Sequence, residues 1–262
     1  MKKTLSITVS LLLILIISHC QSKKLTVSPE TSSSDEALFK LGQSYLKKDA
    51  ERARLIMRQV IESFPKSFYA QRAKLAIADT YFAKKDEGNL ILAAAEYKEF
   101  ISLYPSSPSV AYAQYRIGLC FYEKASKPGR DQQKTRQALA EFKKIVTNYP
   151  LAEEVDLTRE KIKECENRLA EHTFQIGYHY YRVRSYPAAI SRLSEILTNF
   201  PEFSGMDKVY FYLGDSYNRG GKIEESIPYF TKIVSDYPKS KYAKKAQNCL
   251  KEIENTKREE KK

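Results

Sequence analysis

Histidine, cysteine and glycine are scarce in this chain of 262 residues, and tryptophan is absent. The three His and four Cys form no Cys-x-x-Cys pair and no other spacing typical of a zinc site. The signatures GxSxG, HExxH and GxGxxG and the phosphate loop are also missing. Carboxylates are plentiful, but they fall on the polar faces of predicted helices. We therefore expect no enzyme activity, no metal and no cofactor, and free buried thiols at Cys120, Cys165 and Cys249.

Long apolar runs are limited to one, at residues 7–17, which is shorter than the roughly 20 residues that span a bilayer. Basic residues precede the run and Cys20 follows it, so residues 1–19 are predicted to be a signal peptide. The site resembles a bacterial lipobox, which predicts lipidation at Cys20. His19 departs from the small residue usual there, and an ordinary signal peptide is the alternative. Gln21, which is not Asp, points to the outer membrane by resemblance to enterobacterial lipoproteins.

Basic residues are in excess, with a formal net charge of +12. Loss of Lys2 and Lys3 with the signal peptide would leave 12 − 2 = +10. Lys and Glu alternate along the predicted helices, which is typical of solvated helix faces, and we expect no nucleic-acid partner. Some of this charge can attract anionic lipid or an acidic partner surface.

Residues 20–34 are polar and rich in Ser, Thr and Lys, and are predicted to be a flexible tether. From Asp35 onward apolar residues recur at helical spacing and no hairpin signal occurs, which predicts an all-α fold.

Five copies of one pattern follow, each ending in an aromatic residue and Pro. A small residue lies twelve positions before each Pro, and a large apolar residue lies eight positions before it. Further upstream is another small residue, followed three positions later by an aromatic residue. The pattern resembles the tetratricopeptide repeat, in which small residues let two helices approach and Pro ends the second helix. We predict a superhelix of about five helix pairs. The aromatic–Pro pairs are Phe64-Pro65, Tyr104-Pro105, Tyr149-Pro150, Phe200-Pro201 and Tyr237-Pro238.

The copies are unevenly spaced, with intervals of 40, 45, 51 and 37 residues between successive Pro, against about 34 for the ideal repeat. Repeat 2 has a longer turn at 84–89, and repeat 3 has a loop at 126–134. Residues 152–183 are predicted to be one helix of about 30 residues that joins repeats 3 and 4. The array is therefore divided into repeats 1–3 (35–150) and a long helix with repeats 4–5 (151–255), followed by a frayed basic tail (256–262).

A peptide-binding groove is the candidate functional site, because the first helix of each tetratricopeptide pair lines the concave face. When the upstream small residue of each repeat is numbered position 8, the concave face is formed by positions 2, 5, 9, 12 and 13. We expect about half of the aromatic rings at these positions to be buried. The groove candidates are Phe39, Arg72, Leu75, Phe82, Tyr112, Tyr115 and Tyr122. The partner-binding candidates in the loop, long helix and repeat 5 are Arg130, Asp131, Tyr178, Tyr181, Arg182, Phe211 and Arg219.

Three segments, FPKSFYAQRAKLAIADTYF, GRDQQKTRQALAEFKKIV and LAEHTFQIGYHYYRVRSYPAAISRL, resemble the BamD family of lipoproteins of the outer-membrane β-barrel assembly machinery. The resemblance covers about residues 30–250. It implies a lipid-anchored scaffold at the periplasmic face of the outer membrane. It also implies three kinds of partner: a BamA-like barrel protein with POTRA domains, the other lipoproteins of that complex, and C-terminal segments of unfolded outer-membrane proteins. The alternatives are another periplasmic tetratricopeptide scaffold in envelope or division coordination, and a lipoprotein that regulates an envelope enzyme.

Overall fold

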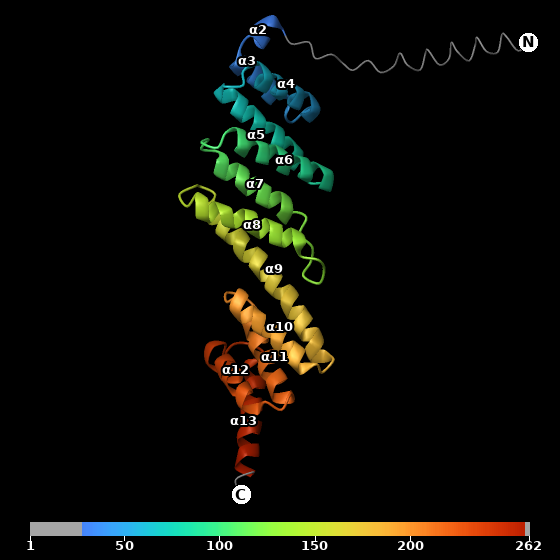
Figure 1. Cartoon of the computed structure of the whole chain (residues 1–262), viewed down its shortest axis with the longest axis vertical. Helices are drawn as coiled ribbons and strands as arrows, with labels where there is room; N and C mark the ends of the chain where they lie inside the picture. Colours follow the sequence, from blue (N-terminus) through green and yellow to red (C-terminus); the bar gives the residue numbers. More distant parts are fainter. Residues whose placement is uncertain (1–27, 260–262) are drawn as a thin grey trace, which may run out of the picture. The chain divides into compact units, whose positions relative to one another are not determined.

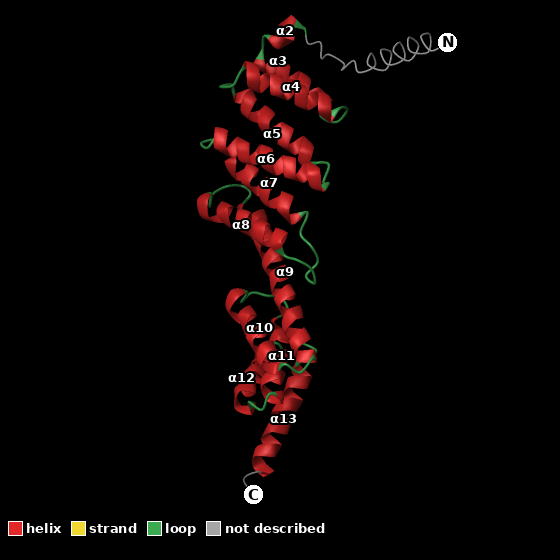
Figure 2. Ribbon diagram, turned by 45° about the vertical axis from the view of Figure 1, so that its right-hand side comes forward, coloured by secondary structure: helices red, strands yellow, loops and turns green. Residues whose placement is uncertain are grey.

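The computed structural model describes residues 28–259, and every regular element in that range is an α-helix (Figure 2). The predicted signal peptide, Cys20 and most of the predicted tether lie outside the described residues. The helices are α2 (Pro29–Ser32), α3 (Asp35–Tyr45), α4 (Ala50–Ser63), α5 (Phe68–Phe82), α6 (Glu87–Leu103), α7 (Val110–Tyr122), α8 (Gln133–Asn148), α9 (Val155–Arg182), α10 (Tyr186–Asn199), α11 (Met206–Arg219), α12 (Ile223–Asp236) and α13 (Ala243–Glu259).

The chain divides into two compact units with a boundary after Thr80, near the end of α5. In the first unit α3 packs against α4. Ser34 and Asp49 cap these two helices, because their side chains accept hydrogen bonds from the backbone N–H of Ala37 and Arg52. A Cβ on Gly42 would lie 2.8 Å from Cε of Met57, so the small residue of repeat 1 meets its large residue.

The second unit contains the same pairing three more times, in α7/α8, α9/α10 and α11/α12. Within each pair the glycine of the first helix faces the large residue of the second. A Cβ on Gly177 would lie 2.8 Å from Cδ2 of Leu193, and one on Gly214 would lie 3.0 Å from Cε1 of Phe230. Helix α13 covers α12 at the C-terminal end. The predicted all-α fold of tetratricopeptide helix pairs is confirmed.

The aromatic residue before each repeat proline ends its helix in the predicted way. All five aromatics follow the last helical residue directly and have φ between −127° and −139°. The ring of a following Pro disfavours the helical conformation at the preceding residue, which favours the end of the five helices at this pair.

Helix α9 is the predicted long connection, and Figure 1 shows it passing from α8 to α10. It has 28 residues, which corresponds to roughly 42 Å. Its first half packs into the core of repeat 3 through Cys165, and its second half packs into the core of repeat 4 through Ala170 and Phe174. None of the helices between residues 28 and 259 has both the length and the apolar character needed to cross a membrane.

Helical structure extends further than predicted at three places. The predicted tether contains the single turn α2, where Ser28 Oγ accepts from the N–H of Thr31. Helix α6 begins at Glu87, inside the predicted turn of repeat 2. The predicted frayed tail is helical as far as Glu259, because Ile253 is buried and Lys257 forms a 2.7 Å ion pair with Glu224.

Candidate functional site

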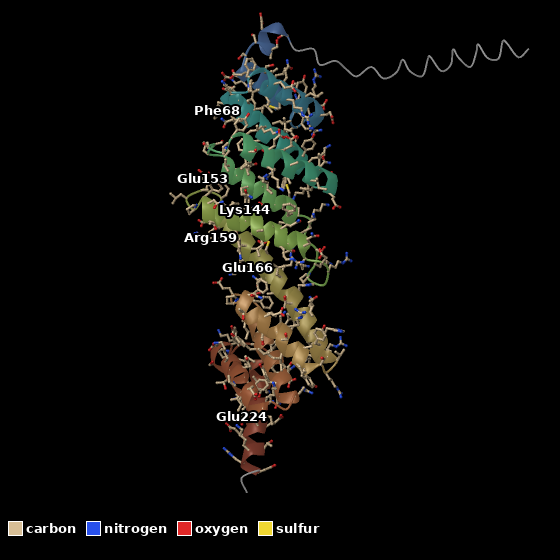
Figure 3. All side chains as sticks on the ribbon, viewed as in Figure 1. Phe68, Lys144, Glu153, Arg159, Glu166 and Glu224 are labelled. Atoms are coloured by element: carbon tan, nitrogen blue, oxygen red, sulfur yellow. The ribbon has the colours of Figure 1, made fainter. Side chains whose placement is uncertain are left out.

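In the first unit, the three groove candidates divide into one buried ring and two accessible side chains. Phe39 is only 2% exposed, so it belongs to the half of the groove rings that we expected to be buried, and its ring is not available to a peptide. It packs on Tyr69 with 5.4 Å between ring centroids, and the Arg72 guanidinium lies 4.9 Å from its centroid. Arg72 is exposed and Leu75 is half-buried. Phe68, which the sequence positions did not select, is 65% exposed and is labelled in Figure 3.

In the second unit, Phe82 and Tyr112 lie beside Arg116 of α7. The guanidinium carbon is 3.8 Å from the centroid of Phe82 and 5.6 Å from that of Tyr112. Arg116 Nε also donates to the hydroxyl of Tyr97 at 3.0 Å. Phe82 is 7% exposed and Arg116 covers its ring face, so Phe82 belongs to the buried half expected among the groove rings. Arg116 was missed, although its position four residues after Tyr112 is a signal for contact on one helix face.

Tyr115 and Tyr122 form the centre of a surface that we call the α7 tyrosine face. Both rings are half-buried and pack on the buried ring of Phe142, with centroids 5.8 Å and 6.5 Å apart. Two cations of α9 lie over Tyr122, with Lys161 Nζ 4.6 Å and Arg168 Cζ 5.1 Å from its centroid. The face therefore combines aromatic rings with positive charge.

Glu164 of α9 holds this face together. It accepts hydrogen bonds from the Tyr122 hydroxyl and from Lys161 Nζ, the latter at 2.9 Å. Burial opposes ionisation of Glu164, but these hydrogen bonds outweigh it and keep its pKa below the ordinary range. Burial raises the pKa of Tyr122, and the hydrogen bond to Glu164 raises it further. The three α9 residues were missed, because the predicted groove used only the repeat positions of each first helix, and these residues precede those positions in α9.

A second set of rings, which we call the α9–α11 aromatic cluster, contains Phe174, Tyr178, Tyr181 and Tyr212. Phe174 and Tyr178 stack with centroids 5.9 Å apart, and Tyr178 and Tyr181 stack at 6.1 Å. Tyr212 meets Tyr178 and Tyr181 edge-on at 4.8 Å and 5.0 Å. Burial raises the pKa of Tyr212, and its tyrosine neighbours add to the shift. Three of the four rings are half-buried, so their edges reach solvent.

Charged groups continue this cluster toward the end of α11. The Tyr181 hydroxyl donates to Asp215 at 2.5 Å, and Arg219 Nε donates to the same carboxylate oxygen at 2.7 Å. Burial and the hydrogen bond to Asp215 raise the pKa of Tyr181. The Arg219 side chain is 56% exposed, and Arg182 at the end of α9 is exposed as well.

Phe211 is a partner-binding candidate whose ring is buried. It is 9% exposed and stacks on Tyr242 with 5.0 Å between centroids. Tyr242 precedes α13, outside the repeat pattern, so the position of Phe211 within its repeat gave no sign that another ring covers it.

Side-chain hydrogen bonds from Gln132 and His172 hold the loop of repeat 3 in place. The buried Gln132 donates through its amide to the carbonyls of Lys127 and Arg130 at 2.8 Å and 3.0 Å. His172 Nδ1 of α9 lies 2.6 Å from the carbonyl of Pro128. Arg130 and Asp131 are exposed, and the Asp131 carboxylate accepts from the backbone N–H at the start of α8. Asp131 therefore has a local structural role besides its accessibility.

The three cysteines between residues 28 and 259 are buried or half-buried free thiols. Burial raises the pKa of Cys120 to about 12 and that of Cys165 to about 11. Cys249 is also a free thiol and is half-buried. Within residues 28–259, His, Cys, Asp and Glu form no group of three or more that could hold a metal ion.

Comparison with known proteins matches residues 31–225 to the family model described as YfiO, outer membrane lipoprotein. The outer membrane protein assembly factor BamD of Rickettsia prowazekii is 27% identical over 260 residues, covering 97% of this chain and all of that protein. BamD of Caulobacter vibrioides is 30% identical over 169 residues, covering 64% of this chain and 54% of that protein.

Among solved structures, the TPR2AB domain of yeast Sti1 in complex with pHSP90 aligns with 84% of this chain and 85% of that chain, at 16% identity and a TM-score of 0.45. BamD proteins are thus among the curated relatives of this chain. Because the family model covers well over half of the sequence, the chain belongs to the YfiO family of outer membrane lipoproteins.

Proposed function

We propose that the protein is a non-catalytic scaffold for outer membrane protein assembly, held by lipid on Cys20 at the periplasmic face of the outer membrane. Membership of the YfiO family and the names of the BamD relatives support the role in assembly. The anchor is supported by the lipobox-like sequence that ends at Cys20.

The α7 tyrosine face is proposed to bind the C-terminal segments of unfolded outer-membrane proteins. The observation that carries this proposal is the pair of α9 cations over the ring of Tyr122. An aromatic side chain of the ligand would pack against Tyr115 and Tyr122. Its terminal carboxylate would be attracted by Lys161 and Arg168. Glu164 keeps Tyr122 and Lys161 in place for this contact.

The α9–α11 aromatic cluster is proposed to bind the periplasmic POTRA domains of a BamA-like barrel protein. Half-buried tyrosines provide a large contact area at small entropic cost, and exposed arginines beside them are typical of interface hot spots. Arg182 and Arg219 supply that charge. The exposed loop residues Arg130 and Asp131 are proposed as a further contact for other lipoproteins of the complex.

A peptide titration tests the first contact. The probe is a dye-labelled peptide that ends in a free C-terminal Phe, measured by fluorescence anisotropy with the full chain. Lys161→Glu combined with Arg168→Glu should weaken binding at least about tenfold, since two attractions become repulsions. The matched control is Arg159→Glu with Lys163→Glu, because both residues are exposed on α9 and carry the same charge change. Equal binding by the two double variants would refute the assignment.

Co-purification from detergent-solubilised membranes tests the second contact. Recovery of a large β-barrel protein with POTRA domains is expected, and Arg182→Glu with Arg219→Glu should reduce it. Arg192→Glu with Arg184→Glu is the control, since both arginines are exposed and lie outside the cluster. Reproducible absence of such a barrel protein from the wild-type sample would contradict the proposal and favour another envelope scaffold.

A further inference from the structure

A pocket of about 250 Å³ opens between α6, α7 and α8. Its apolar lining includes Leu90, Ile91 and Ala94 of α6 and Phe121 of α7. Phe121 follows Tyr115 by six residues, which places it roughly 120° away around α7 at about 100° per residue. The pocket is therefore separate from the α7 tyrosine face. Ile91 is 62% exposed, so apolar surface continues from the lining into solvent.

Three lysines surround this apolar lining, against a single carboxylate. Lys98, Lys124 and Lys134 line the pocket together with Glu87, which gives a local balance of 3 − 1 = +2. The ammonium groups of Lys98 and Lys134 lie 5.7 Å and 5.5 Å from the ring centroid of Phe121. Lys98 belongs to α6, Phe121 to α7 and Lys134 to α8, so the packing of the three helices brings two of the lysines to one ring.

We propose that this lysine-rimmed pocket binds an acidic segment of a partner protein that inserts one bulky apolar side chain. The side chain would pack on Phe121 and Leu90, and carboxylates on either side of it would pair with Lys98 and Lys134. Charge complementarity is the reason for this choice of ligand. An apolar pocket with a net positive rim attracts an apolar side chain that is flanked by negative charges.

The size of the pocket favours a protein segment over a lipid. The volume is below the roughly 300–1,000 Å³ of small-molecule sites, so one large side chain fills it. A lipid acyl chain would leave most of its length in water, which removes its hydrophobic gain. The inference goes beyond the assembly role proposed above, and the pocket and the α7 tyrosine face can be occupied together.

The test uses the full chain and the probe Gly-Asp-Glu-Phe-Glu-Asp-Gly, with a dye at its N-terminus and an amide at its C-terminus. The amide removes the terminal carboxylate, so failure here leaves the C-terminal-signal proposal unaffected. Fluorescence anisotropy should detect binding that weakens with salt. Replacing the probe's Phe with Ser, or its acidic residues with Lys, should abolish binding.

Protein variants locate the binding. Lys98→Glu with Lys134→Glu should raise Kd at least about tenfold. The control Lys47→Glu with Lys48→Glu changes the charge equally at two exposed residues of the first unit and should stay within about twofold. Ile91→Ser should weaken binding without affecting the fold, since its side chain is mostly exposed. Circular dichroism checks that each variant folds.

Three results would overturn the proposal. The first is no binding to the wild type at about 1 mM protein, and the second is an equal loss in the control variant. The third is competition of anionic phosphatidylglycerol vesicles with the probe on the wild type but not on the Lys98→Glu, Lys134→Glu variant. That third result would identify the pocket as a lipid site instead.

Discussion

Gly118→Ala tests whether the close approach of α7 and α8 in repeat 3 is needed for stability and for peptide binding at the α7 tyrosine face. A Cβ at this position would lie 2.6 Å from Cδ1 and 3.0 Å from Cζ of Phe142. Phe142 is fully buried, so its ring can move only by displacing the side chains that pack on it. Overpacking of this kind costs about 1–3 kcal/mol, and the contacts place Gly118 at the upper end. The higher helix propensity of Ala offsets about 1 kcal/mol, which leaves a net loss of about 2 kcal/mol.

Urea denaturation measures this loss as a lower midpoint with an unchanged slope. Repeat arrays can unfold in parts, so hydrogen exchange of the α7 and α8 amides should accompany the titration and locate the weakened pair. Binding of the peptide with a free C-terminal Phe should also weaken, because Tyr115 and Tyr122 rest on the displaced ring.

Gly88→Ala is the matched control. The same change in the first turn of α6 meets only a carboxylate oxygen of Asp86 at 3.6 Å. It should therefore leave stability unchanged or raise it by up to about 1 kcal/mol. If Gly118→Ala were as stable as Gly88→Ala, the proposed role of the close approach would be refuted.

Three further outcomes follow from individual groups. Cys120 and Cys165, with pKa values of about 12 and about 11, should resist iodoacetamide at neutral pH in the folded protein and react in urea; labelling of the folded chain would contradict their burial. Tyr181 has its pKa raised above the ordinary 10.0, so the stability it contributes is complete below that pH and is lost as pH rises through the elevated pKa. Ultraviolet titration against Tyr181→Phe measures this, and Asp215→Asn should lower the pKa toward its ordinary value. Asp49→Ala should cost about 1 kcal/mol in urea denaturation through loss of the α4 cap, and no change would show that the cap is dispensable.

The repeat pattern predicted much of the fold, because its residues act through local sterics. Each of the five repeat aromatic–Pro pairs directly follows the last residue of a helix, and Gly177 meets Leu193 because their spacing in the pattern sets the approach of two helices. The length of α9 was also predictable, since it contains no Pro and its one Gly, Gly177, is a repeat position. These features depend on one helix or one pair.

The candidate site was less predictable, because a helix position gives direction but not the neighbour that covers it. Phe82 and Phe211 occupy groove positions, yet Arg116 lies over one ring and Tyr242 stacks on the other. Tyr242 belongs to no repeat position, so its contact depends on the packing of α13. The burial of these rings is decided by contacts between helix pairs, which the pattern does not encode.

Helix α9 gives the two proposed contacts a fixed relation within the second unit. Lys161 and Arg168 contribute to the α7 tyrosine face, while Tyr178 and Tyr181 contribute to the α9–α11 aromatic cluster. Lys161 and Tyr181 are twenty residues apart on one uninterrupted helix, which corresponds to roughly 30 Å. Both ends of α9 are packed into cores, so neither contact can rotate relative to the other unless the helix bends or a core opens. A ligand on one face and a partner on the other would therefore be held at a set distance and orientation, which is the property that a scaffold for assembly requires.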